Sequence, residues 1–291
     1  MPFYDLDDAH LFYEDTGSGS PPIVFVHGAL CQHDDWRHQI PPFARRHRVL
    51  APDLRAHGRS REQPGQIGVE RFSIDVRAML DAAGVVEPAV LVGHSMGCRV
   101  LLQIWRDAPE RVAALVFVDG AYLVPTPLGD LDDDARRSRA DDARRRALEL
   151  FIGGGPAARL QVGFTGMFFD ERFAAERDRV LDHALSLPSE VPRELMPGFA
   201  AWDVMNLESV LATVTVPALA FASTKMDGAS ERRPLGPNES TAWLQALSQH
   251  VPGAEIVRLH GTGHFVMLEQ PALVNERIAR FIDDHRLVSA G

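Results

Sequence analysis

The 291 residues are 45% hydrophobic and 24% charged, a composition that excludes a disordered or fibrous chain. Lys and Arg number 30 against 40 Asp and Glu, so the formal net charge is −10 and a phosphate backbone would be repelled. We therefore expect no nucleic-acid partner. The length fits a single large hydrophobic core, with or without an insertion.

The two cysteines, Cys31 and Cys98, provide neither a disulfide framework nor the spacing of a zinc site, so we expect no metal. The acidic first residues lack the basic and apolar regions of a secretory leader. No apolar run approaches the ~18 residues needed to span a bilayer. These features predict a cytoplasmic protein that does not contact a membrane.

Short apolar segments alternate with amphipathic ones over the first 120 residues. An antiparallel pair of strands is predicted first, at 3–7 and 10–17. Strands that are apolar on both faces and separated by helices predict a parallel sheet covered on both sides. Such strands are predicted at 21–28, 48–54, 88–95 and 112–120, with helices at 36–47, 69–84 and 95–111.

The middle of the chain follows a different pattern, because 123–214 contains no segment that predicts a strand. Helices are predicted there at 130–150, where charges of both signs indicate a solvated face, and at 170–187. The alternating pattern then resumes, with strands at 216–224 and 254–261 and helices at 240–251 and 271–286. We therefore predict an α/β core of about eight strands, formed by 1–122 and 215–291, with a helical insertion at 123–214.

A candidate nucleophile lies where the apolar strand 88–95 meets the following helix. The sequence there is Gly93-His94-Ser95-Met96-Gly97, a G-x-S-x-G pattern in the strand–turn–helix context that the pattern requires. A sharp turn forces the serine into an unfavourable backbone conformation, and glycines two residues away allow strand and helix to pass closely. The Ser95 hydroxyl would then stand at a helix N-terminus, where developing negative charge is favoured.

Two backbone N–H groups are candidates for stabilising the charge that develops on a substrate oxygen. One follows the nucleophile, at Met96, and the other comes from the loop after an earlier strand. We choose Ala29 for the second because Gly28 lets the chain turn inward. We interpret His27 as a structural residue that hydrogen-bonds this loop, and not as a base.

Among twelve histidines, His264 is the best candidate for a general base. It follows the last predicted strand, next to Gly263, and a neutral imidazole suits proton abstraction from a serine near neutral pH. Two acids could orient its ring. Asp119 ends an apolar strand and is our preferred choice, whereas Asp227 lies in a polar loop and is the less favoured alternative.

Four segments together resemble the α/β-hydrolase fold superfamily: HGAL at 27–30, DLRAHGRS at 53–60, GHSMG at 93–97 and GTGHFVMLEQP at 261–271. The resemblance implies a mostly parallel, twisted sheet with helices on both faces, an order of serine, acid and histidine along the chain, and no cofactor. It also implies that 123–214 is a helical cap over the site.

The chain departs from the usual pattern of this superfamily after the seventh strand of the core. Pro217 and Leu219 match that pattern, but Met226 stands where the acid is expected, and Asp227 is one residue late. The departure favours Asp119, which matches the position after strand six used by a minority of members. That minority includes lactonases of the zearalenone-hydrolase type and cofactor-free quinolone dioxygenases, whose loop resembles the segment 30–33.

The substrate is expected to be a small apolar or aromatic molecule, because no basic pair is placed to clamp a phosphate or carboxylate. Candidate pocket residues are Leu30, Cys31, Phe164, Phe168 and Trp202. The favoured function is hydrolysis of an ester or lactone by Ser95, His264 and Asp119. The alternatives are a cofactor-free dioxygenase or lyase with His264 as base, and a non-catalytic binding module. Either a monomer or a homodimer is compatible with the sequence.

Overall fold

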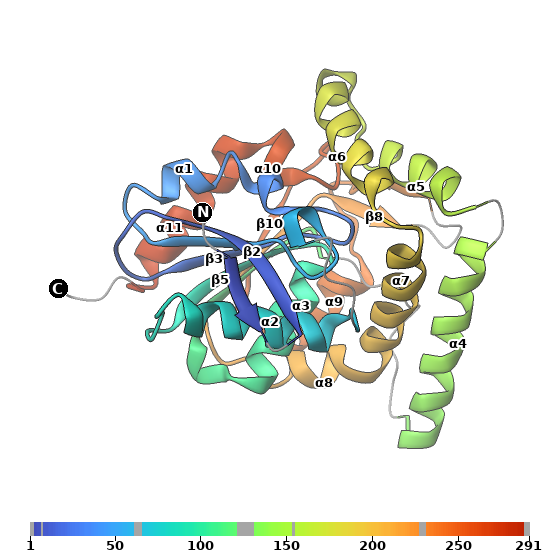
Figure 1. The fold of residues 1–291 in the computed structure, drawn as a ribbon, viewed down its shortest axis with the longest axis horizontal. Coiled ribbons are helices and arrows are strands. Elements are labelled where there is room, and N and C mark those ends of the chain that lie inside the picture. The colour runs from blue at the N-terminus through green and yellow to red at the C-terminus, as the bar shows by residue number, and fades with distance from the viewer. Residues whose placement is uncertain are drawn as a thin grey trace.

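A mostly parallel sheet of eight strands forms the centre of the computed structural model, which describes residues 3–6, 8–60, 66–120, 131–152, 155–226 and 231–287 (Figure 1). The strands lie in the order β1-β2-β4-β3-β5-β6-β7-β10. Their bounds are Phe3–Leu6 for β1, Ala9–Thr16 for β2, Ile23–Val26 for β3, Val49–Pro52 for β4, Ala89–His94 for β5, Val112–Val118 for β6, Ala218–Ala222 for β7 and Glu255–Arg258 for β10. The prediction of an α/β-hydrolase fold with about eight strands is confirmed.

The burial of the central strands agrees with their parallel pairing. Every residue of β3, β5 and β7 is buried, as expected for central strands with helices on both faces. The antiparallel part is confined to one edge, where β1 pairs with β2 and β2 with β4. Because β5, β6 and β7 are parallel neighbours, the residues that follow them meet at one edge of the sheet.

Helices cover both faces of this sheet. Figure 1 shows α1 (Ile40–Phe43), α10 (Val266–Glu269) and α11 (Pro271–Asp284) on one side. On the other side lie α2 (Val69–Ala82), α3 (Gly97–Asp107) and α8 (Glu208–Leu211), with α9 (Ala242–His250) packed against α8. None of the helices in the described part of the chain is long and apolar enough to cross a bilayer.

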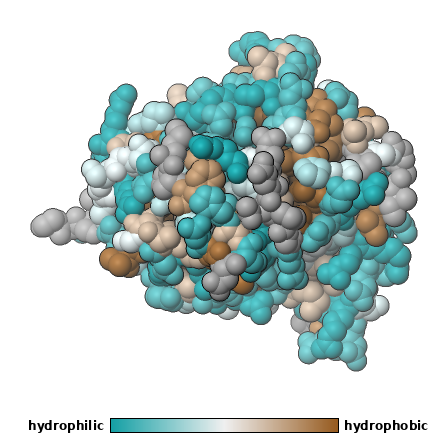
Figure 2. Space-filling model, viewed as in Figure 1, coloured by the Kyte–Doolittle hydropathy of each residue, from teal (hydrophilic) through white to brown (hydrophobic). Residues whose placement is uncertain are grey.

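Between β6 and β7 the chain forms a group of helices at one side of the molecule (Figure 1). They are α4 (Asp133–Ile152), α5 (Pro156–Thr165), α6 (Ala174–Ser186) and α7 (Glu190–Trp202), and a π-helical turn (Asp203–Leu207) joins α7 to α8. As predicted, this region shows no strand within the described ranges 131–152 and 155–214. Most residues of α4 are exposed or half-buried, and Figure 2 shows this helix as a hydrophilic edge of the molecule.

The structure departs from the predicted elements in three places. The predicted helix 36–47 is the single turn α1, preceded by a 3-10 turn at His33–Trp36. Helices α5 and α7 were not predicted, because a glycine run precedes α5 and Pro197 lies inside α7. The segment interpreted as a polar loop forms a small antiparallel pair, β8 (Thr224–Met226) and β9 (Arg232–Pro234).

Candidate active site

The turn between β5 and α3 holds Ser95 in a strained conformation. Its φ is +53°, in the left-handed region that non-glycine residues rarely adopt. A Cβ on Gly97 would lie 2.4 Å from the carbonyl oxygen of Val26, and one on Gly93 would lie 2.7 Å from the backbone of Gly97. The two glycines therefore allow the close approach that lifts Ser95, half-buried, into a cavity.

His264 and Asp119 form a buried pair. Nδ1 of His264 lies 2.7 Å from Oδ2 of Asp119, and both side chains are 2% exposed. Asp119 follows β6 directly and has a φ of +45°, which turns its carboxylate toward the loop that carries His264. The imidazole therefore presents Nδ1 to the carboxylate, which leaves Nε2 available to a reacting group.

Five groups stabilise the charge of Asp119, and three of them are hydrogen-bond donors of Ser223 and Thr224. The N–H groups of Ser223 and Thr224 donate to Oδ1 at 2.8 and 3.1 Å, and the Thr224 hydroxyl donates to Oδ2 at 2.6 Å. Burial by itself would raise the pKa of Asp119, but the hydrogen bonds, the His264 ring and the charge of Arg232 outweigh it and hold the pKa at about 2. Asp119 is therefore a carboxylate throughout the working range of an imidazole.

Arg232, on β9, approaches the same pair. Its Nη1 lies 3.6 Å from Oδ2 of Asp119 and 3.2 Å from Nδ1 of His264, and it donates to the Thr224 hydroxyl at 2.5 Å. Its Nη2 donates to the sulfur of Met226 at 3.5 Å. Burial and then this cation lower the pKa of His264 to about 4, against the opposing effect of Asp119. The ring is therefore neutral near pH 7, the state in which it accepts a proton.

The loop after β3 places Ala29 in the cavity wall, while Met96 begins the elbow helix. Neither the Ala29 nor the Met96 N–H donates a hydrogen bond to another group in the described parts of the chain. Leu30, whose φ is +60°, is held by a hydrogen bond from its N–H to Nε2 of His57 at 3.0 Å. His27 accepts from the Leu54 N–H at 3.0 Å and contacts the Gly28 carbonyl at 2.7 Å, which agrees with a structural role.

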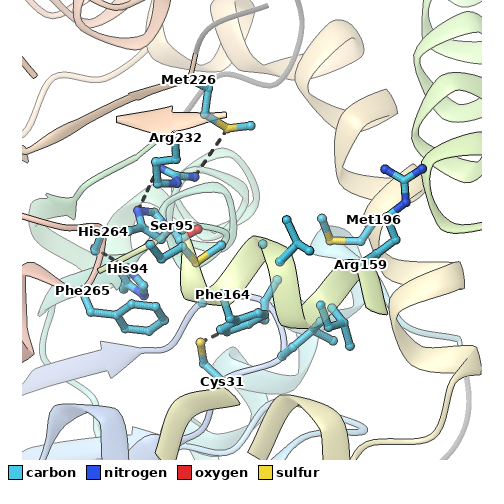
Figure 3. A pocket seen from close by; sticks show the side chains of 18 of the residues that line it. Cys31, His94, Ser95, Arg159, Phe164, Met196, Met226, Arg232, His264 and Phe265 are labelled. Atoms are coloured by element: carbon cyan, nitrogen blue, oxygen red, sulfur yellow. Dashed lines mark hydrogen bonds between the residues drawn. The ribbon is translucent and has the colours of Figure 1, made fainter. Parts of the chain in front are cut away.

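Ala29, Ser95 and His264 line a common cavity of about 510 Å³. Figure 3 shows Ser95, His264 and Arg232 at one end of it, with Met196 and Arg159 at the other. Most of the lining side chains are apolar and come from α5, α7 and the loop after β3, among them Leu30, Cys31, Leu160, Phe164, Met196 and Phe199.

Two of the predicted pocket residues do not reach the cavity. Trp202 is 2% exposed, and its indole N–H donates to Oε1 of Gln103 at 2.8 Å, so it joins α7 to α3 behind the wall. Phe168 stacks on Phe265 with 5.0 Å between ring centroids, and Phe265 is the ring that lines the cavity. Asp227, the alternative acid, lies outside the described residues.

Known proteins resemble this chain over nearly its whole length. A family model described as the alpha/beta hydrolase family matches residues 23–277. The chain belongs to that family. A putative carbamate hydrolase, RutD, of Azorhizobium caulinodans is 28% identical over 97% of this chain and 98% of its own length.

Solved structures of similar fold include hydrolases. Est816, described as an N-acyl homoserine lactone degrading enzyme, has a TM-score of 0.70 and 25% identity, covering 96% of this chain and 100% of that chain. A thermophilic esterase from Thermogutta terrifontis has a TM-score of 0.75 and 25% identity, covering 95% and 94%.

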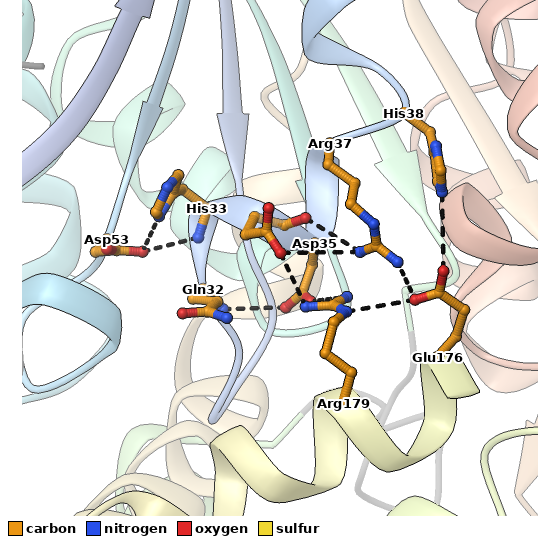
Figure 4. Close-up of polar contacts among 9 residues, drawn as sticks. Gln32, His33, Asp35, Arg37, His38, Asp53, Glu176 and Arg179 are labelled. Atoms are coloured by element: carbon orange, nitrogen blue, oxygen red, sulfur yellow. Dashed lines mark hydrogen bonds and ion pairs between the residues drawn. The ribbon is translucent and has the colours of Figure 1, made fainter. Parts of the chain in front are cut away.

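In this alpha/beta hydrolase, charged side chains tie the loop after β3 to helix α6 (Figure 4). Arg179 of α6 donates to Asp34 at 3.2 Å and to the buried Asp35 at 2.7 Å. Asp35 also accepts the N–H of Gln32 at 3.0 Å, and Glu176 contacts Arg37. The segment that begins at Ala29 is therefore linked through its own turn to a helix of the insertion.

The charged residues that line the cavity within the described chain were not predicted from the sequence; they are Arg99, Arg159, Glu231 and Arg232. Two of these arginines, Arg99 and Arg232, have side chains that are only 5% and 10% exposed. Arg99 of α3 forms a bidentate pair with the buried Asp203, with both N–O distances 2.6 Å. Arg232 lies five residues after Asp227, in the same polar stretch of sequence. No local pattern distinguishes either arginine from a surface residue, because their partners are distant in sequence.

Proposed function

We propose that this chain is a serine hydrolase that cleaves a carboxylic ester or lactone of an apolar or aromatic small molecule through an acyl-enzyme. The observation that supports it best is the position of Ser95, on a strained turn, at the same end of the cavity as the His264–Asp119 pair. A nucleophile, a base and a group that orients the base are the parts required for acyl transfer by a hydroxyl.

The reaction would begin when Nε2 of His264 takes the hydroxyl proton of Ser95 as Oγ attacks the substrate carbonyl. Asp119 keeps the Nδ1–H of the ring oriented and stabilises the imidazolium that forms. The imidazolium then gives its proton to the departing alkoxide oxygen, and the acyl group stays on Ser95. A water molecule, deprotonated by the same ring, then attacks the ester so formed. The bond between the acyl carbon and Oγ breaks, the imidazolium returns its proton to Oγ, and the acid is released.

Negative charge on the carbonyl oxygen would be stabilised by the backbone N–H groups of Ala29 and Met96. Each is without an internal acceptor in the described parts of the chain, so a substrate oxygen would supply one. Donors placed in advance lower the barrier because they need no reorganisation during the reaction; loss of one such donor typically costs roughly 3–4 kcal/mol. The start of α3 at Gly97 adds the favourable end of a helix.

The insertion at 123–214 would act as a cap that excludes water and selects the substrate. Residues of α5 and α7 line the cavity together with the loop after β3, so a bound molecule would be enclosed by both parts. A volume of about 510 Å³ lies within the range of small-molecule sites. The apolar wall supports an apolar or aromatic acyl or alcohol portion, and the descriptions of the two neighbours as an esterase and a lactone-degrading enzyme support both ester and lactone.

Labelling with a fluorophosphonate, followed by peptide mapping, tests the nucleophile. We expect a single adduct on Ser95, absent in Ser95→Ala and retained in Ser209→Ala, whose hydroxyl lies on the surface and bonds the Asn206 carbonyl. Labelled protein should lose its activity on a panel of aromatic esters and lactones. Turnover of none of them, together with failure to label Ser95, would favour a binding module. Oxygen consumption with a heteroaromatic substrate would favour the cofactor-free dioxygenase.

A further inference from the structure

Arg232 occupies a position that the proposed mechanism does not use. Figure 3 shows its side chain beside the ring of His264. Arg232 belongs to β9, which pairs with β8, and its side chain is 10% exposed. Its Nη1 contacts three groups at once: the Thr224 hydroxyl at 2.5 Å, Nδ1 of His264 at 3.2 Å and Oδ2 of Asp119 at 3.6 Å. A desolvated guanidinium therefore lies against the edge of the imidazole that faces the carboxylate.

The contact between Arg232 and His264 cannot be an ordinary hydrogen bond. A guanidinium has donors and no acceptor, and Nδ1 of His264 uses its own proton in the 2.7 Å bond to Asp119. Two N–H groups consequently face each other at 3.2 Å. The arrangement is tolerable while the ring is neutral, but protonation of Nε2 would place two full positive charges in contact within a site that little water reaches.

The remaining charged groups around the ring do not replace this effect. His94 of β5 is itself held neutral, because burial keeps its pKa well below the usual value. Glu269 of α10 bonds the Gly263 N–H, and burial raises its pKa to about 7, so it is uncharged in mild acid. Arg99 of α3 also lowers the pKa of His264, but less than Arg232 does, and it is paired with Asp203. Among the described residues, the charged groups in direct contact with the ring in mild acid are thus Asp119 and Arg232.

We propose that Arg232 is a positioning residue that keeps His264 in its neutral, proton-accepting form in mild acid, and that makes the same ring a weaker base at neutral pH. The proposal rests on the proposed function for its effect on turnover. It extends that function by assigning to one arginine of β9 the lower limit of the working pH range. Because Asp119 stays ionised throughout, the competition between its charge and that of Arg232 decides the state of the ring.

The test compares Arg232→Met with Arg232→Lys, and uses Arg233→Met as a matched control. Arg233 is the next residue of β9, but its guanidinium bonds Glu239 at 2.6 Å on the other side of the strand. For each variant, kcat/KM is measured from pH 3.5 to 9 on one ester that the wild type hydrolyses, with circular dichroism and a thermal melt to establish folding.

Wild type and Arg233→Met should lose activity around pH 4. In Arg232→Met this acid limb of the pH–activity profile should move to a pH about one unit higher or more, which is the usual effect of removing a like charge in contact. Activity of Arg232→Met at pH 8 should equal or exceed that of wild type, so the two profiles cross. Arg232→Lys should keep the limb near its wild-type position, because the charge is retained.

A second readout does not depend on hydrolysis. In the Ser95→Ala background, the titration of the His264 ring is followed by NMR of ¹³C-labelled histidine, assigned with His264→Gln, with and without Arg232→Met. A folded Arg232→Met in which neither the ring nor the acid limb shifts would overturn the proposal. So would equal shifts in Arg232→Met and Arg232→Lys, which would mark a purely structural role. If no ester is turned over but the ring titration shifts as stated, the proposed function fails and the role of Arg232 stands.

Discussion

Oδ2 of Asp119 lies 2.7 Å from Nδ1 of His264, although 145 residues separate the two in sequence. The sheet explains the contact. Asp119 follows β6, His264 follows β10, and β7 lies between those strands as a parallel neighbour of both. Ser223, at the end of β7, bridges the gap, because its N–H donates to Asp119 and its hydroxyl donates to the Gly263 carbonyl.

The first prediction concerns the acid. Asp119→Asn should reduce kcat by about 10³- to 10⁴-fold on an ester, because an amide would favour the wrong tautomer of His264. Asp227→Asn, which makes the same chemical change at the alternative acid, should retain activity within about threefold of wild type. Steady-state kinetics of both folded variants decide the matter. Loss confined to Asp227→Asn would show that the acid has been assigned to the wrong residue.

The second prediction concerns the close passage of the elbow over β3. Gly97→Ala should lower the free energy of unfolding by about 1–3 kcal/mol, since its Cβ would lie 2.4 Å from the Val26 carbonyl oxygen and backbone must move. Gly198→Ala is the matched control, because a Cβ there meets nothing within 4 Å inside α7. It should stabilise the protein by roughly 0.5–1 kcal/mol. Urea unfolding measures both, and equal effects would contradict the explanation.

The elbow and the base were predictable because each depends on local rules. A strand, a glycine-flanked serine and a helix follow one another within a few residues, so Ser95 could be placed from sequence alone. Five non-glycine residues in the described chain have positive φ, and Leu30, Ser95 and Asp119 are three of them. These three residues belong to segments that the sequence analysis singled out, and their backbone conformations are strained in the structure.

The walls of the site were less predictable, because a periodic pattern does not reveal which face of a helix meets which partner. Trp202 was expected in the cavity, but the hydrogen-bonding need of its indole is met by Gln103 on α3. Arg232 was hidden for a similar reason. It stands between two charged residues, Glu231 and Arg233, and its role arises from a short strand pair that brings it against Asp119.

The third prediction concerns the buried ion pair that joins the elbow helix to the end of α7. Asp203→Asn should destabilise the fold by about 3–5 kcal/mol, because the guanidinium of Arg99 would lose the charge of its bidentate partner at 2.6 Å. The double variant Arg99→Met with Asp203→Leu should recover much of that loss, since an apolar pair leaves no unpaired charge. Thermal and urea unfolding measure both. A double variant as unstable as the single one would mean that the loss comes from packing and not from charge.

The fourth prediction concerns the link between helix α6 and the loop that carries Ala29. Arg179→Met removes the cation that holds the buried Asp35, whose other oxygen accepts the Gln32 N–H and shapes the turn just beyond Cys31. Arg179 is 28% exposed, so the loss of stability should be small, about 1 kcal/mol. The value of kcat should fall by about 3- to 10-fold, with little change in KM. A displaced N–H donor weakens contacts that are made in the transition state and not in the bound substrate.

Arg177→Met is the control for this last prediction. It removes the same charge from the same helix, but the ion pairs of Arg177 within the described residues are with Glu171 and Asp178 and not with the loop. Its kcat should stay at the wild-type value. An equal fall in kcat for both variants would show that the net charge of α6, and not the contact with Asp35, controls the site. A rise in KM with unchanged kcat in Arg179→Met would instead place the effect on substrate entry.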